Sequence, residues 1–208
     1  MTAFDLAARL AELAEVSETG RWQRHSSVRL AARALDGYAS DGRWGTKTGF
    51  PVLYLVRPTD SVVVEAYRHQ VDPLDFDTEQ DRQTFIAGLL PRVLVTCEVS
   101  VTGLLDLRTA TARAASGLAV QDLQCPTYDR AGYQRCQQVA QVAHQLGRHG
   151  LIAPAATGLG ETLVLFTDLL PQQEKPTRIG EDETWASLPD DPRLPSPRPV
   201  LRLVRDSE

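Results

Sequence analysis

The side chains best suited to chemistry lie between residues 21 and 69, where arginines, aromatic rings and a glutamate follow one another in short motifs. An arginine binds anions through a planar fork of donors. A carboxylate stabilises positive charge that develops during a reaction, and an aromatic ring offers a flat apolar face. In chain order the candidates are Arg24, His25, Arg43, Trp44, Tyr54 and Glu65.

Glu65 is the candidate whose neighbours are most informative. It lies between Val64 and Ala66, which predicts that its carboxylate is partly buried. A buried carboxylate is costly unless a cation or a hydrogen-bond donor meets it. Arg24 and Arg43 are the natural partners in this segment, so we expect them near Glu65.

Most of these candidates also have a purely structural interpretation. Glu65 can pair along a helix with Arg68 or His69, an interaction of about 0.3 kcal/mol without catalytic meaning. Tyr54 lies in an apolar run and suits a core position as well as a ligand-binding one. Trp44 can simply pack its own loop, and arginines in ordinary loops are mostly solvated.

Hydrophobic periodicity predicts the elements that hold these residues. Residues 51–56 form a short β-prone run, which predicts a buried strand carrying Tyr54. Residues 61–69 fit a helix or a strand, and residues 93–101 alternate strictly, as a strand with one buried face does. The other predicted elements are a strand at 104–107, a helix between Thr109 and Gly117, a helix over 133–146 with Gly150 as its stop, and strands at 151–153 and 162–166.

Both ends of the chain differ from this central pattern. Residues 2–16 predict an amphipathic helix that covers the core or contacts another copy, and we assign residues 1–20 to it. Residues 20–49 predict a loop with one short helix near 28–35. Seven of the 13 prolines lie in the last 38 residues, which predicts an extended arm over 171–208 with a possible strand at 200–204. We therefore expect one α+β domain with its core at 21–170.

Six motifs in this order resemble one known family, the RES-domain toxins of bacterial toxin–antitoxin pairs. The motifs are Trp22-Gln23-Arg24-His25, Gly42-Arg43-Trp44, Phe50-Pro51-Val52-Leu53-Tyr54-Leu55, Glu65-Ala66, Cys136-Gln137 and Gly150-Leu151-Ile152-Ala153-Pro154-Ala155-Ala156. The resemblance covers most of residues 21–166. It implies an ADP-ribosyltransferase-like mixed β-sheet core flanked by helices, in an enzyme that destroys NAD+.

The resemblance also implies roles for individual residues. The catalytic residues would be Arg24, Tyr54 and Glu65, and the NAD+-binding residues Arg24, His25, Arg43, Trp44, Tyr54 and Gln134. For Gln134 the structural alternative is a solvated position on its helix, which we favour. Many family members carry a serine where this chain has Ala155, and an asparagine where it has Gly45. Thr157 or Tyr133 are the hydroxyls that we consider as substitutes.

These residue types suit cleavage of the nicotinamide–ribose bond. Such a reaction passes through an oxocarbenium-like state, which a fixed carboxylate stabilises, and arginines suit the diphosphate. The resemblance implies phosphate or water as acceptor, no prosthetic group, and a cognate helical antitoxin of the Xre type with a DNA-binding part. Two alternatives stay open: transfer of ADP-ribose to a protein, and an inactive domain that binds a nucleotide or a partner.

The overall charge excludes other partners. With 22 Lys and Arg against 27 Asp and Glu, the net charge of −5 argues against direct binding of nucleic acid or of an anionic membrane. Residues 21–47 nevertheless carry six bases and two acids, a basic segment fit for a small anion. Three cysteines without a C-x-x-C pair favour a reducing compartment over a disulfide framework or a metal site, so we expect a cytoplasmic protein.

Overall fold

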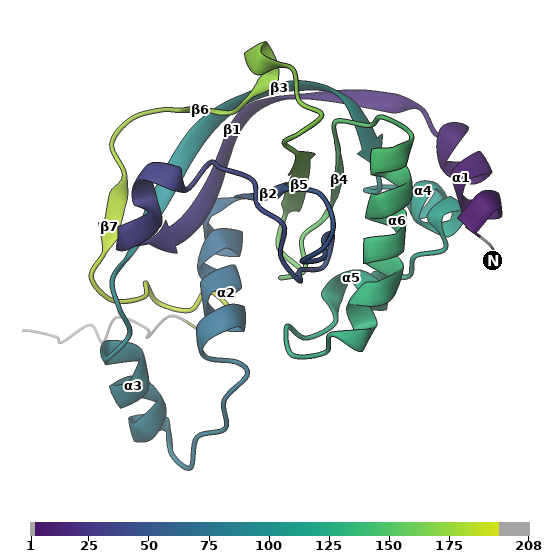
Figure 1. Ribbon diagram of the computed structural model, residues 1–208. Coiled ribbons are helices and arrows are strands. Elements are labelled where there is room, and N and C mark those ends of the chain that lie inside the picture. The colour runs from purple at the N-terminus through teal and green to yellow at the C-terminus, as the bar shows by residue number, and fades with distance from the viewer. Residues whose placement is uncertain (1–2, 196–208) are drawn as a thin grey trace, which may run out of the picture.

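Two long strands organise the molecule, and the computed structural model describes residues 3–195. Strand β1 (Glu15–Ser27) pairs antiparallel with β3 (Arg92–Asp106), from Glu15 opposite Leu105 to Ser27 opposite Arg92. In Figure 1 the two strands arch together over the other elements. A pair of this length provides the frame of the sheet, to which the other described strands pair directly or, in the case of residues 161–166, through two of the others.

Three shorter strands close a ring beneath this arch. They are β2 (Val52–Arg57), β4 (Gly150–Pro154) and β5 (Glu161–Phe166), paired in the order β1–β2–β5–β4–β3. The β3–β4 pair is parallel and the others are antiparallel, so the sheet is mixed. Two further strands, β6 (Thr177–Arg178) and β7 (Glu183–Trp185), pair with β3 from outside the ring.

Alternation along the strands separates two apolar clusters. Leu53 and Leu55 of β2 pack with the fully buried Trp22 of β1 and with Cys97 of β3 in one cluster. Tyr54, which lies between the two leucines, belongs to the other face of the sheet and packs against a second cluster. Successive side chains of a strand point to opposite faces, so β2 places Leu53 and Leu55 in the first cluster and Tyr54 on the opposite face of the sheet.

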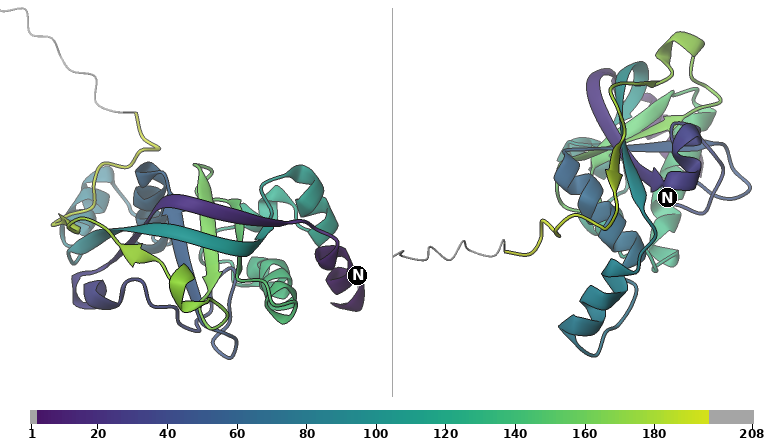
Figure 2. Two further views of the ribbon diagram at one scale, coloured as in Figure 1. Left: turned by 90° about the horizontal axis from the view of Figure 1, so that it is seen from above. Right: turned by 90° about the vertical axis from the view of Figure 1, so that its left-hand side faces the viewer.

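Helices gather at the two ends of the sheet (Figures 1 and 2). Helices α1 (Ala3–Ala11), α4 (Ala110–Ser116), α5 (Val120–Gln124) and α6 (Gln134–Gln145) lie at one end, and α2 (Thr59–Gln70) and α3 (Glu79–Ala87) at the other. Short 3-10 turns occupy Val28–Arg33, Ala131–Tyr133 and Gln172–Glu174. Within residues 3–195, no helix is both long and apolar enough to cross a membrane.

The structure confirms the α+β class with a mixed sheet and flanking helices. Segment 59–70 is a helix, which decides between the two interpretations left open for it. The alternating segment 93–101 is part of β3, and the predicted strand at 104–107 continues the same strand rather than forming a new one. Thr109 caps α4 by accepting from the Ala112 N–H, and Gly117 ends that helix with a positive φ of 71°.

Several predictions about boundaries are wrong. The first helix ends at Ala11 rather than at 16 or 20, because residues from Glu15 onward pair with β3. The predicted loop over 20–49 begins with strand residues up to Ser27, whose polar sequence shows no alternation and is held by backbone pairing. Helix α6 is followed by Gly147 with φ 75°, not stopped by Gly150, which already belongs to β4.

The proline-rich arm is not simply extended coil. Its first half adds β6 and β7 to the sheet. Leu188 packs on the cluster of α2 and α3, and the Pro189 carbonyl accepts a 2.9 Å hydrogen bond from the Tyr67 hydroxyl. The possible strand at 200–204 lies outside the described residues.

Candidate active site

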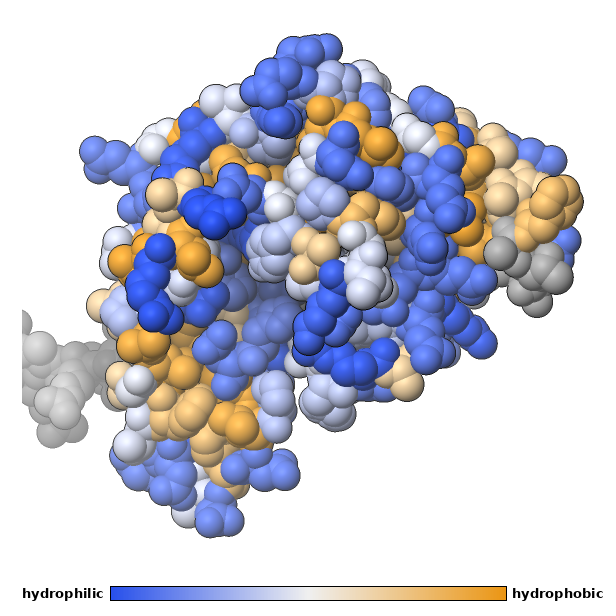
Figure 3. Space-filling view, in the orientation of Figure 1, coloured by the Kyte–Doolittle hydropathy of each residue, from blue (hydrophilic) through white to orange (hydrophobic). Residues whose placement is uncertain are grey.

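A cavity of about 430 Å³ opens between α2, the loop that precedes β2, and the segment 122–133. Its size falls in the range of small-molecule sites. Figure 3 shows the hollow near the centre of this face, with mostly hydrophilic residues around it. Among residues 3–195, five arginines and two carboxylates line it: Arg24, Arg43, Arg68, Arg92, Arg130, Asp41 and Glu65. This excess of arginine suits an anionic ligand.

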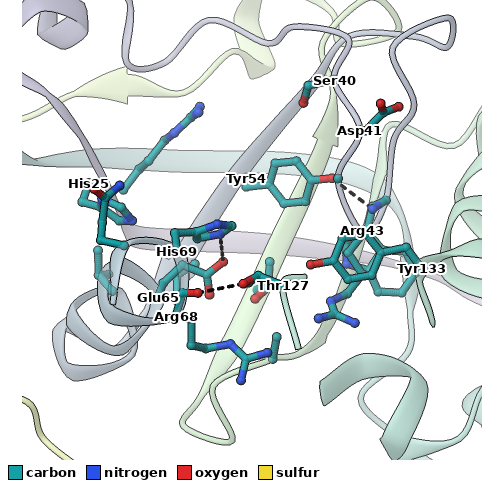
Figure 4. A pocket seen from close by; sticks show the side chains of 18 of the residues that line it. His25, Ser40, Asp41, Arg43, Tyr54, Glu65, Arg68, His69, Thr127 and Tyr133 are labelled. Carbon is teal, nitrogen blue, oxygen red and sulfur yellow. Dashed lines mark hydrogen bonds and ion pairs between the residues drawn. The ribbon is translucent and has the colours of Figure 1, made fainter. Parts of the chain in front are cut away.

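Glu65 lies on the cavity face of α2, as Figure 4 shows. Its side chain is 28 % exposed, and it accepts a 3.3 Å hydrogen bond from Nε2 of His69 one helical turn later. Burial would raise the pKa of Glu65, but the hydrogen bond from His69 and the charge of Arg68 outweigh it and hold that pKa below its ordinary value. Glu65 is therefore an ionised carboxylate inside the cavity, and the predicted pairing with His69 exists alongside this position.

Tyr54 stands on β2 beside Glu65 in the cavity (Figure 4). Its hydroxyl accepts a 3.0 Å hydrogen bond from the backbone N–H of Trp44, and burial raises the pKa of the hydroxyl well above its ordinary value. A Cβ at Gly42 would lie 2.7 Å from this hydroxyl, so the loop approaches Tyr54 this closely only because residue 42 is glycine. The protonated hydroxyl keeps its own hydrogen free to donate to a ligand.

Trp44 is only 2 % exposed, and it belongs to the apolar cluster under α6. It borders the cavity, but burial of this extent means that the ring mainly packs its loop against the core. The structural interpretation of this residue is the one that the structure supports.

Arg43 is buried and ties its loop to the segment 122–130. Its two terminal nitrogens donate to the carbonyls of Asp122 at 2.6 Å and Cys125 at 2.8 Å. Its guanidinium lies 4.6 Å from the centroid of the Tyr133 ring. Arg68, from α2, donates to the same Cys125 carbonyl at 2.9 Å. Two arginines thus fasten one wall of the cavity, and most donors of Arg43 are already used within the protein.

Arg24 and His25 enter the cavity from the end of β1. Arg24 donates to the Ala34 carbonyl at 3.1 Å and to the Tyr38 hydroxyl at 2.9 Å. His25 accepts at Nδ1 a 2.8 Å hydrogen bond from Nε of Arg92, which also lines the cavity. The expectation that Arg24 and Arg43 lie at the same site as Glu65 is met, although neither forms an ion pair with it.

Gln134 does not lie at the cavity, where a role in NAD+ binding would place it. It is exposed at the start of α6 and does not line the cavity. The residue one turn further along, Gln137, turns inward and donates to the carbonyls of Gly42 at 2.9 Å and Gly45 at 3.1 Å. A helix advances about 100° per residue, so an error of a few positions moves a side chain from one face to another.

The position where the family carries serine is buried. Ala155 is 1 % exposed, whereas its neighbours Pro154 and Ala156 line the cavity. Of the two residues considered as substitutes, Tyr133 lines the cavity, whereas the hydroxyl of Thr157 is hydrogen-bonded to the hydroxyl of Ser61 at 2.7 Å. Tyr133 is therefore the better placed of the two.

Sequence reasoning missed Arg68, Arg92 and Arg130 as members of the site. The sequence indicates Arg68 only as a helix neighbour of Glu65. Arg92 begins β3, which the sequence predicts from apolar alternation and not from any charged residue. Arg130 donates to the Asp41 carbonyl at 2.6 Å from a segment without periodicity. No group of three or more metal-ligating side chains that could hold a metal ion occurs within residues 3–195.

Comparison with known proteins agrees with this geometry. The chain matches the model of the RES domain over residues 18–187, which includes β6 and β7. It is 30 % identical over 155 residues to proteins of Mycobacterium tuberculosis and Mycobacterium bovis named NAD(+) phosphorylase MbcT, covering 74 % of this chain and 72 % of theirs. The crystal structure of the M. tuberculosis MbcT–MbcA toxin–antitoxin complex matches with a TM-score of 0.70 and 24 % identity, over 87 % of this chain and 92 % of that one.

The structural match and the family match support each other. The TM-score shows a shared fold, and the matched residues 18–187 contain all the residues that line the cavity. On these grounds the chain belongs to the RES domain family.

Proposed function

We propose that this protein cleaves the nicotinamide–ribose bond of NAD+ and transfers the ADP-ribosyl group to inorganic phosphate. The observation that carries the proposal is the ionised Glu65, held beside Tyr54 in a cavity that five arginines of residues 3–195 line. Membership of the RES domain family and the printed name of the mycobacterial relatives, NAD(+) phosphorylase, support the same reaction. NAD+ enters as substrate, and the reaction uses no prosthetic group.

Glu65 is assigned to the charge that develops on the ribose. The bond from C1′ to the nicotinamide nitrogen breaks with its electron pair going to that nitrogen, which leaves an oxocarbenium-like ribose and a neutral nicotinamide. A phosphate oxygen then forms the new bond to C1′, so the products are nicotinamide and ADP-ribose-1″-phosphate. A carboxylate fixed beside the ribose lowers the barrier because its negative charge faces the developing positive charge.

Arginines are assigned to the anionic parts of the substrates. Arg92 keeps both terminal nitrogens free of any partner within the described chain, at the cavity end formed by β1 and β3. Arg24 at the same end donates from its terminal nitrogens to the Ala34 carbonyl and the Tyr38 hydroxyl, and its Nε has no partner among the described residues. Arg43 is buried, whereas Arg24 is only partly buried, and the terminal nitrogens of Arg43 donate to two carbonyls of the cavity wall. We therefore assign diphosphate binding to Arg24 and the shaping of the cavity wall to Arg43, with Tyr54 donating to the ribose.

The acceptor is tested by the identity of the product. We expect purified protein, incubated with NAD+ in phosphate buffer, to yield ADP-ribose-1″-phosphate by mass spectrometry, and to slow at least tenfold when phosphate is replaced by a non-nucleophilic buffer. Free ADP-ribose at an unchanged rate would indicate hydrolysis. ADP-ribose attached to protein would indicate transfer to a side chain, and either result would contradict phosphorolysis.

A protein partner follows from the same relationship. We propose that a helical antitoxin of the Xre type, with a DNA-binding part, silences this enzyme by covering the cavity. The likeness to a toxin solved with its antitoxin supports this proposal. We expect the product of the adjacent reading frame to copurify with this chain and to abolish NAD+ consumption at equimolar ratio. Copurification without inhibition would contradict a block at the cavity.

A further inference from the structure

Two neighbouring strands bring a histidine and an arginine together at one end of the cavity. His25 of β1 is opposite Leu94 of β3, and Arg92 lies two residues before Leu94. Diagonal neighbours of this kind share a face of the sheet and are within reach of a long side chain. The distance from Arg92 Nε to His25 Nδ1 is 2.8 Å. Trp185 of β7 is opposite Arg92, with its ring at 17° to the imidazole and 6.5 Å from it.

This hydrogen bond determines where the imidazole carries its proton. Arginine is always charged and only donates, so Nδ1 of His25 must be the acceptor. A neutral imidazole that accepts at Nδ1 carries its hydrogen on Nε2. A proton on Nδ1 would remove the hydrogen bond and place a second cation against the guanidinium. The contact with Arg92 therefore selects the neutral imidazole of His25 with its hydrogen on Nε2.

We propose that Arg92 is a positioning residue that holds His25 as a neutral imidazole, with its Nε2–H as a donor to an oxygen of the nicotinamide riboside half of the substrate. The proposal rests on the proposed function for the identity of that substrate. Its structural part, the tautomer, does not depend on the reaction. Strand β7 lies beyond the predicted core at 21–170, and its Trp185 packs beside both Arg92 and His25.

The charges around His25 come from every neighbouring element. Arg24 lies beside it on β1, Arg92 on β3, and Glu65 and His69 face it from α2. On β7 the carboxylate of Glu183 accepts from Trp185 Nε1 at 3.0 Å. Burial first, and then Arg92, lower the pKa of His25 to about 3, although Glu65 raises it. The imidazole is therefore neutral over the whole range in which an enzyme of this kind works.

A neutral histidine matters because of the charge on the substrate. The nicotinamide ring of NAD+ is cationic until its bond to ribose breaks. An imidazolium beside it would repel the bound substrate, and it would also compete for the negative charge of Glu65. A neutral donor still orients the substrate without either penalty. Loss of Arg92 should therefore matter most under mildly acidic conditions, where a free histidine becomes protonated.

The test compares Arg92→Ala with the wild type. The control is Arg33→Ala, which removes an arginine whose side chain is 77 % exposed and lies outside the cavity. We expect kcat/KM of the wild type and of the control to show no ionisation of His25 between pH 5 and 8. In Arg92→Ala the neighbouring cation is gone, so the pKa of His25 should rise although burial still opposes its protonation, and kcat/KM should fall toward acidic pH by up to about tenfold per pH unit. The double variant Arg92→Ala/His25→Gln should lose this ionisation.

Nuclear magnetic resonance of the imidazole nitrogens supplies a second readout without substrate. We expect His25 of the wild type, assigned by its loss in His25→Gln, to show the Nε2–H tautomer and no titration between pH 5 and 8. A wild-type His25 that titrates near pH 6.5, or an Arg92→Ala enzyme that loses activity equally at every pH, would overturn the proposal. If NAD+ is not cleaved at all, the proposed function fails, and the nitrogen spectra still decide the tautomer.

Discussion

Replacement of Glu65 by glutamine is expected to reduce NAD+ cleavage by about 10²–10³-fold while the protein stays folded. Glutamine keeps the size of the side chain and its ability to accept a hydrogen bond, but it removes the negative charge that faces the developing oxocarbenium. Removal of one group that stabilises transition-state charge typically costs this much in kcat. Nicotinamide release, followed by liquid chromatography, measures the effect.

Stability should change little in this variant. The contact that Glu65 makes with His69 joins side chains that are 28 % and 50 % exposed, and such a pair contributes about 0.3–0.5 kcal/mol. The matched control is Glu79→Gln on α3, whose carboxylate is 67 % exposed and bonded to Arg82. The control should keep full activity. Equal losses in the two variants, or an active Glu65→Gln enzyme, would show that Glu65 has only a structural role.

Replacement of Arg43 by alanine is expected to lower the free energy of unfolding by about 3 kcal/mol. Arg43 is 9 % exposed, and loss of its guanidinium leaves the carbonyls of Asp122 and Cys125 without this partner. Hydrogen bonds to a charged group contribute about 1.5–3 kcal/mol each, and buried acceptors left unpaired add a further cost. The contact with the Tyr133 ring is lost as well. The midpoint of urea denaturation measures this change.

The control for Arg43 is another arginine of the same wall. Arg130 is exposed and donates to one carbonyl, that of Asp41, so Arg130→Ala should cost less than about 1 kcal/mol. Hydrogen exchange should also rise in the segment 122–130 of Arg43→Ala and not in Arg130→Ala. Equal destabilisation by the two substitutions would mean that Arg43 is not the main fastening of this wall.

Local signals were sufficient for the elements that carry Tyr54 and Glu65. The apolar run at 51–56 predicts β2, and the period of two of a strand explains why Tyr54 lies on the face opposite to that of Leu53 and Leu55. For α2 the sequence allowed a helix or a strand, and both placed Glu65 between buried neighbours. These predictions succeeded because each depends on residues close together in the chain.

The parts that sequence could not predict depend on contacts between distant segments. The polar strand β1 has no alternation of its own and exists because 12 of its 13 residues pair with β3. Arg92 enters the site through that same pairing, and Trp185 reaches it through β7. Gln134 was predicted at the site but lies away from the cavity, because the exact face of a helix does not follow from spacing alone. The deep burial of Trp44 at the cavity could not be predicted from spacing either.

The most direct test of the whole account is whether the purified chain alone releases nicotinamide from NAD+ in phosphate buffer. We predict that it releases one nicotinamide for every NAD+ consumed, over many turnovers per protein molecule, and that Glu65→Gln prepared in parallel does not. NAD+ that stays intact with a folded wild-type protein at high concentration would contradict the account, and would leave the cavity as a binding site without catalysis.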